Sequence, residues 1–151
     1  NMTKIWIDAD AAPRAVKDVL IRASQRRKVS IVFVANRNLS VPVSSRLEMI
    51  AVAAGADVAD DYIAENCDNG DLVVSADVPL AARVVERGGT VLQPRGRVLD
   101  HDNIDEALSI RNFGDSLRSS GVETGGPPPF KPEDKQKFSN ALDRWLTINR
   151  F

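Results

Sequence analysis

Two aspartates near the start of the chain, Asp8 and Asp10, have the residue type and spacing of a metal-binding acidic site. In an extended backbone, side chains two residues apart point to the same side, about 7 Å from one another. A third aspartate, Asp77, also follows an apolar run. Crowded carboxylates repel one another unless a cation neutralises them, and oxygen ligands suit Mg²⁺ or Mn²⁺. We therefore take Asp8, Asp10 and Asp77 as candidate catalytic residues and metal ligands, because such a site can activate water against a phosphodiester.

A helix cap is the alternative role for two of these aspartates. Asp10 lies ahead of Pro13 and Asp77 ahead of Pro79, and proline is common in the first turn of a helix. An aspartate just before such a turn often accepts a hydrogen bond from the first free backbone N–H groups. Each of the two residues is thus equally well explained as an N-cap when it is considered alone.

Further polar residues extend the candidate site. Asp57, Asp60 and Asp61 could supply another carboxylate, although acidic residues near a helix start also favour the helix dipole. A substrate phosphate could be bound by residues of two loops, and short basic loops are also common as plain solvated surface. These weaker phosphate candidates are Asn36, Arg37 and Arg95.

The remaining reactive residue types have no predicted role. His101 is the only histidine and lies in a polar linker, so we expect it to be exposed and inert. Cys67 is the only cysteine, which excludes an intrachain disulfide and a thiolate zinc cage. Trp6 and Trp145 fall on apolar patterns, so we expect burial in a core or interface rather than base stacking.

Alternating strands and helices are predicted to position the aspartates. Short apolar runs rich in β-forming residues predict strands, and helical spacing of apolar residues predicts the helices between them. The expected strands are 4–7, 31–35, 72–75 and 90–92, with 47–52 ambiguous but closer to a strand, and the expected helices begin near Pro13, Val58 and Pro79. This order predicts an α/β fold with a Rossmann-like, open and mostly parallel sheet over residues 3–93. Ligands bind beyond the carboxyl ends of such strands, where Asp8 and Asp77 lie.

Residues 94–151 are predicted to form a helical extension of the same single domain. A helix should follow Asp102 and Asn103, and the Gly-Gly-Pro-Pro-Pro segment at 125–129 should form a stiff turn. The final helix, from Pro132, has an apolar stripe formed by Phe138, Ala141, Leu142, Trp145 and Leu146. This stripe should dock on the domain or on a second subunit, so a homodimer through the C-terminal helix remains open.

Bulk properties fit one domain of 151 residues with a real core. Because Met2 is the usual first residue, we expect Asn1 to be foreign to the natural chain and the fold to begin at Thr3. There is no export signal and no apolar run near the roughly 20 residues that span a bilayer, so we expect a cytoplasmic protein. The 20 Lys and Arg against 21 Asp and Glu neither support nor exclude a nucleic-acid partner.

Several motifs together resemble the YaiI/YqxD family of bacterial proteins, over nearly the whole chain. They are DADAAP at 8–13, VAN at 34–36, GDLVVSADVPLA at 70–81, PRG at 94–96 and TGGPP at 124–128. The family is regarded as PIN-like, which implies a Rossmann-like sheet and an acidic site similar to that of Mg²⁺-dependent ribonucleases acting on RNA. Matched to that pattern, Asp8 and Asp77 correspond best to the strand-end acids, Asp10 comes next, and Asp60 is a contribution from a helix.

The chain departs from the family pattern at two positions. Ala12 stands where cysteine is usual, and Gln93 stands where asparagine usually precedes Pro-Arg-Gly. A mechanism with a cysteine nucleophile in the first loop is therefore not expected for this chain.

Three functions are compatible with the sequence. The first is a nuclease that uses Mg²⁺ or Mn²⁺. The second is a phosphohydrolase of the haloacid-dehalogenase type, which also has an Asp-x-Asp pair after its first strand, although Ala12 is not the expected Thr or Val. The third is a non-catalytic domain that binds nucleic acid or a nucleotide, since a fold alone never establishes chemistry.

Overall fold

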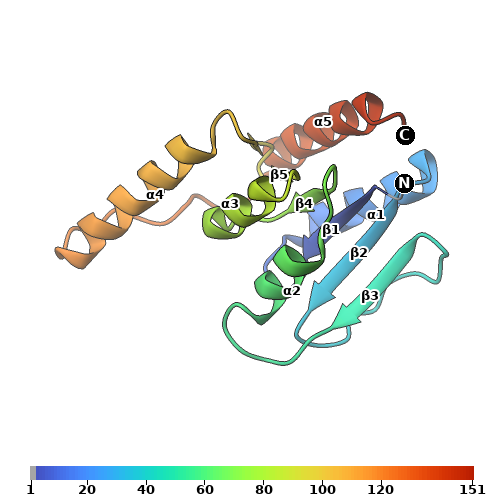
Figure 1. Ribbon diagram of the computed structural model, residues 1–151, viewed down its shortest axis with the longest axis horizontal. Coiled ribbons are helices and arrows are strands. Elements are labelled where there is room, and N and C mark those ends of the chain that lie inside the picture. The colour runs from blue at the N-terminus through green and yellow to red at the C-terminus, as the bar shows by residue number, and fades with distance from the viewer. Residues whose placement is uncertain (1–2) are drawn as a thin grey trace.

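A six-stranded sheet with helices on both faces forms the body of the molecule (Figure 1). The computed structural model describes residues 3–151, and Asn1, expected to precede the fold, lies outside the described residues. The strands are β1 (Lys4–Asp8), β2 (Ser30–Ala35), β3 (Leu47–Ala51), β4 (Leu72–Val74), β5 (Thr90–Leu92) and β6 (Val98–Leu99). Their order is β3-β2-β1-β4-β5-β6, with β1 to β5 parallel and β6 antiparallel to β5. The predicted Rossmann-like, mostly parallel α/β fold is confirmed, and the ambiguous segment near Leu47 is a strand.

Within residues 3–151, five helices connect or flank the strands. They are α1 (Arg14–Arg27), α2 (Val58–Asn66), α3 (Val78–Glu86), α4 (Ile104–Ser119) and α5 (Pro132–Ile148). Side chains alternate across β1, so Ile5 and Ile7 enter the core shared with α1 and α5, while Trp6 enters the core shared with α2 and α3. Both faces of the central strands are therefore covered, as expected for apolar parallel strands.

The strand order reverses at β1, which has β2 on one side and β4 on the other. The crossovers therefore run to opposite sides of the sheet at this point, and a crevice opens beyond the carboxyl ends of β1 and β4. The chain topology itself thus places the ends of these two strands where a ligand is expected.

The C-terminal helix α5 packs on its own domain. Phe138, Ala141, Leu142 and Leu146 are buried in the same core as α1, and Trp145 is half-buried and stacks on Phe151. Since the apolar stripe is already covered within the chain, it no longer gives a reason to expect a homodimer through α5. The sequence allowed the stripe to dock either on the domain or on a second subunit, and in the structure it packs on the domain.

The turn before β6 was not predicted, and it fastens the extension to the sheet. Gly96 has a positive φ of 98°, and a Cβ atom at this position would lie 2.8 Å from the backbone of Lys137 in α5. Arg95 donates to Asp134 of α5 at 3.0 Å and also to the carbonyl of Pro128. Arg95 therefore holds the loop, the 125–129 segment and α5 together.

Helix α4 extends beyond the body of the molecule (Figure 1). Its first turns pack on α3 through buried Ile104 and Ala107, whereas Ile110 and Phe113 are 59% and 65% exposed. The predicted helix after Asp102 and Asn103 is therefore present, and its apolar residues are buried mainly in its first turns. Within residues 3–151, no helix is both long and apolar enough to cross a membrane.

Candidate functional site

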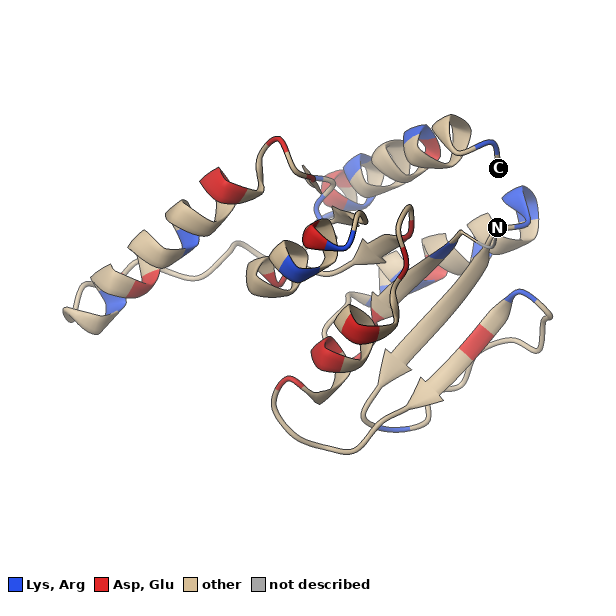
Figure 2. Cartoon of the chain, viewed as in Figure 1, with Lys and Arg blue, Asp and Glu red and all other residues tan. Residues whose placement is uncertain are grey.

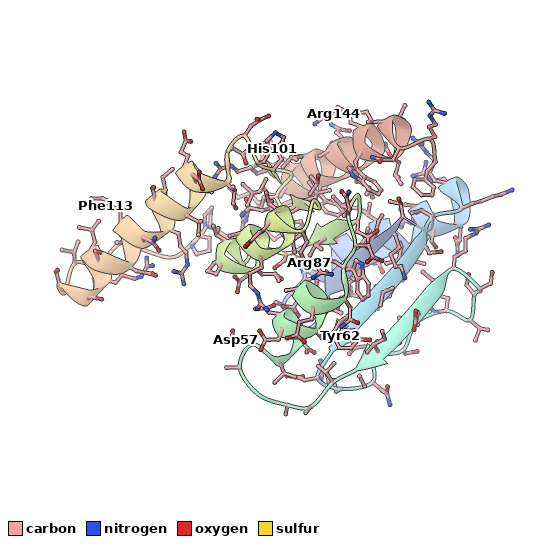
Figure 3. The ribbon with its side chains drawn as sticks, in the orientation of Figure 1. Asp57, Tyr62, Arg87, His101, Phe113 and Arg144 are labelled. Atoms are coloured by element: carbon pink, nitrogen blue, oxygen red, sulfur yellow. The ribbon has the colours of Figure 1, made fainter. Side chains whose placement is uncertain are left out.

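The candidate site is built by three elements that meet at the reversal of strand order. Asp8 is the last residue of β1, Asp60 lies in the first turn of α2, and Asp77 is the N-cap residue of α3. Helix α2 follows β3 and lies close to β1 and β2, with Asp57 at its start (Figure 3). One strand end and two helix starts therefore direct aspartates to the same crevice.

Asp8 is half-buried, and its pKa is raised above the ordinary value. Burial is the largest cause, and the negative charges of Asp10 and Asp77 add to it. Hydrogen bonding with Asp60 and with the backbone of Ala11 lowers the pKa in part. Asp8 is thus a carboxylate that the structure makes costly to ionise without a cation.

Asp60 is the most perturbed member of the site, with a pKa raised to about 7. Burial is again the largest cause, followed by the charge and hydrogen bonding of Asp77 and then of Asp8. Its Oδ1 atom is buried and has no hydrogen-bond donor within residues 3–151. A carboxylate oxygen in this position lacks a partner, whereas a protonated Asp60 can donate to a neighbouring carboxylate.

Asp77 caps helix α3 and also lies next to Asp60 in the crevice. Its Oδ1 accepts a hydrogen bond from Leu80 N at 2.9 Å, and its own N–H donates to Ser75 Oγ at 3.0 Å. The alternative role as helix cap is therefore confirmed for this residue. Asp77 nevertheless lies close enough to Asp60 to raise its pKa, so the cap orients the carboxyl group without removing it from the crevice.

Asp10 lies on the rim of the site and does not cap the following helix. Helix α1 begins after Pro13 without any side-chain cap, so the alternative role of Asp10 as an N-cap is wrong. Its Oδ2 instead accepts from the backbone N–H of Asn36 at 2.7 Å, and Arg37 lies 3.8 Å from its Oδ1. Asp10 thus links the end of β1 to the end of β2.

Two open cavities meet at Asp60. One, of about 220 Å³, lies beside β1 and is lined by Asp8, Asp10, Ala11, Asn36, Gly55, Asp57, Ala59 and Asp60. The other, of about 350 Å³, lies beside α3 and is lined by Asp57, Asp60, Asp61, Asp77, Pro79, Leu80, Arg83 and Arg111. The acidic residues therefore line space that a ligand can enter.

The donor set suits a hard divalent cation, although the side chains do not form a closed cage. In the described part of the chain, no three Asp, Glu, His or Cys side chains are already arranged to hold a metal. Mg²⁺ usually keeps several water ligands and is bound through one or two carboxylates. The partnerless oxygen of Asp60 next to Asp8 fits this kind of partial coordination.

The weaker phosphate candidates differ in their surroundings. Arg37 is exposed beside Asp10, and Asn36 lines the smaller cavity. Arg95 is engaged by Asp134 and Pro128, so its guanidinium stabilises the fold in this structure. His101 is exposed as expected, and Asp102 lies 3.3 Å from it. Cys67 is buried, and burial raises the pKa of its thiol.

Two arrangements were not predicted from the sequence, one that supports β4 and one at the edge of the acidic crevice. Asp71, just before β4, is buried and accepts hydrogen bonds from Lys4 N, Trp6 Nε1 and Asp68 N at 2.9–3.0 Å. Its position directly before an apolar strand was the only available signal. Arg83 of α3 lines the larger cavity together with Asp60 and Asp77. This placement depends on how the helices pack, so the local sequence carries no signal for it.

Comparison with known proteins identifies the family. The model of the uncharacterised YaiI/YqxD family matches residues 6–148. A UPF0178 protein of Desulfotalea psychrophila is 56% identical over 143 residues, which cover 95% of this chain and 97% of the relative. A UPF0178 protein of Maridesulfovibrio salexigens is 49% identical, with 97% and 99% covered. No solved structure matches the chain. The chain therefore belongs to the YaiI/YqxD family.

Proposed function

We propose that this protein is a Mg²⁺- or Mn²⁺-dependent nuclease that hydrolyses a nucleic-acid phosphodiester, with RNA as the substrate to test first. The observation that carries the proposal is the meeting of Asp8, Asp60 and Asp77 at the reversal of strand order. Open α/β sheets bind their ligands at this place. The resemblance to PIN-like ribonucleases supports the choice of RNA.

The energetic state of the site supports cation binding. Asp8 and Asp60 both have raised pKa values because of burial and neighbouring negative charge. A divalent cation would remove this repulsion and give the buried Oδ1 of Asp60 a partner. Clustered carboxylates that are unfavourable when ionised alone are thus a reason to expect affinity for a cation.

The residues divide into two groups in the proposed reaction. Asp8 and Asp60 would hold the cation, and Asp77, at the start of α3, would supply a further carboxyl oxygen. Asp10, fixed by Asn36 and close to Arg37, lines the side from which substrate would enter. When bound, the cation would lower the pKa of a water molecule and stabilise charge on the phosphate.

Cleavage assays with matched variants test the proposal. The protein is incubated with labelled RNA, labelled DNA and p-nitrophenyl phosphate, each with Mg²⁺, Mn²⁺ or EDTA. We expect metal-dependent RNA cleavage that falls at least 100-fold in Asp8→Asn, since catalytic groups typically contribute 10²–10⁴-fold. Asp18→Asn, an exposed carboxylate on α1, is the control and should cleave normally.

Three results would contradict the proposal. RNA cleavage that survives in Asp8→Asn would show that this residue is not part of the site. Hydrolysis of p-nitrophenyl phosphate alone would favour a phosphohydrolase. Metal-dependent RNA binding without any cleavage would favour a non-catalytic binding domain.

A further inference from the structure

The larger cavity joins the acidic crevice to two arginines. Asp60 and Asp77 line one part of it, and Arg83 of α3 and Arg111 of α4 line another. The cavity holds about 350 Å³ and is open to solvent. In Figure 2, acidic residues lie along α2, whereas α3 and α4 carry both basic and acidic residues. The opening is thus lined by both carboxylates and guanidinium groups, and the two arginines come from α3 and α4.

Helix packing fixes both arginines in this place. Asp77 caps α3 and so sets the start of the helix that carries Arg83. Helix α4 packs on α3 through buried Ala107, and Arg111 lies four residues later on the same helix face. The guanidinium groups therefore reach the cavity from two packed elements rather than from a loose loop.

Both guanidinium groups retain free donors. Arg83 donates through Nη1 to Asp61 at 2.6 Å, and Arg111 contacts Asp115 through Nη1 at 2.8 Å. A guanidinium group has five N–H donors, and the Nη2 and Nε groups of these two have no hydrogen-bond acceptor among residues 3–151. Each side chain is about 45% exposed, so these ion pairs contribute little and can yield to a phosphate.

We propose that Arg83 and Arg111 bind a backbone phosphate of the nucleic-acid strand, next to the phosphate that lies at the acidic crevice. This inference rests on the proposed function and names the path that the substrate takes. A ligand that crosses the whole cavity must carry negative charge at the arginines and bring a cation to the aspartates. A nucleic-acid strand with its divalent counterions has this charge pattern, and arginine matches phosphate geometry with paired hydrogen bonds.

Binding assays with the cleavage-deficient Asp8→Asn protein test the role of the two arginines directly. Fluorescence anisotropy measures the Kd of a labelled single-stranded RNA octamer for Asp8→Asn protein with Mn²⁺, alone and combined with Arg83→Ala or Arg111→Ala. We expect each alanine variant to weaken binding about tenfold and to reduce the salt slope by about 0.7 for each lost phosphate contact. Arg144→Ala, on α5 and far from the cavity (Figure 3), is the matched control and should bind normally.

A lysine variant and two small competitors sharpen the test. Arg83→Lys keeps the positive charge and should recover part of the lost affinity, which a mere folding defect would not allow. Inorganic phosphate and adenosine monophosphate should compete only at concentrations far above the Kd of the octamer. Competition by the mononucleotide at the same concentration would overturn the assignment of a strand in favour of a free nucleotide.

The outcomes separate this inference from the proposed function. Unchanged octamer binding in both arginine variants, or no octamer binding at all, would overturn the inference. RNA cleavage that is intact in both variants would leave the nuclease standing without this phosphate site. Arginine-dependent binding with no cleavage under any metal would remove the nuclease and leave the phosphate site.

Discussion

Replacing Asp60 by asparagine should stabilise the metal-free protein at pH 8. In the folded protein, burial and the neighbouring charges of Asp77 and Asp8 raise the pKa of Asp60 to about 7. An asparagine has the shape of the neutral acid and can also donate to a neighbouring carboxylate. The substitution therefore removes the cost of ionising this position while keeping its hydrogen bonding.

The expected size follows from the pKa shift. From the ordinary value of 3.8 to about 7, at about 1.4 kcal/mol per unit, the full shift corresponds to roughly 4 kcal/mol. Asp60 is only partly buried, so solvent screening reduces this, and we expect about 1–2 kcal/mol. For a chain of this length, that is a rise in Tm of about 2–8 °C.

The pH dependence has a definite sign. Between pH 4 and 7 the folded protein keeps a proton on Asp60 that the unfolded chain has released. The stability of the wild-type protein therefore falls, relative to Asp60→Asn, as pH rises through this window, and the difference is constant above it. The advantage of the variant should be largest at pH 8 and clearly smaller at pH 4.5, and it should vanish only below the ordinary pKa of 3.8.

Thermal melts at pH 8 and pH 4.5, with EDTA throughout, measure this difference. Asp18→Asn serves as the control for loss of an exposed carboxylate that lines neither cavity. The reasoning is refuted if Asp60→Asn is less stable than wild type at pH 8, or if the difference is equal at both pH values. Adding Mn²⁺ at pH 8 should reverse the order, because the cation binds the ionised form of the wild-type site.

Four further substitutions at three positions test other parts of the structure, by thermal melts and, for Mn²⁺ affinity, by calorimetry. Asp77→Ala should cost about 1 kcal/mol through loss of the α3 cap, whereas Asp77→Asn should keep the cap and lose Mn²⁺ affinity in calorimetry. Asp71→Ala should cost about 2–4 kcal/mol because three N–H donors lose their acceptor, and a cost below 1 kcal/mol would contradict that role. Gly96→Ala should cost more than 1 kcal/mol, since its Cβ would collide with the backbone of Lys137, and an unchanged Tm would argue against this packing of α5.

Local sequence was sufficient to predict the strands and the residues at their ends. Strands β1, β2 and β4 each contain a continuous apolar run. Polar residues, such as Asp8 in β1, follow each run and mark where the strand ends. Parallel strands joined by right-handed crossovers carry their carboxyl ends to one edge. The sequence therefore determined that Asp8 and Asp77 share an edge of the sheet.

The tertiary structure decided which of the other residues join them. Asp57, Asp60 and Asp61 are equivalent as sequence. In the structure, Asp60 has a buried Oδ1 without a hydrogen-bond partner and a pKa raised to about 7, because α2 presents this position toward β1 and α3. Likewise, Arg83 and Arg111 lie 28 residues apart and share a cavity only because α4 packs on α3. Burial and charge coupling arise between elements that are distant in the sequence, so no local pattern specifies them. These two effects distinguish a candidate site from aspartates that merely follow strands.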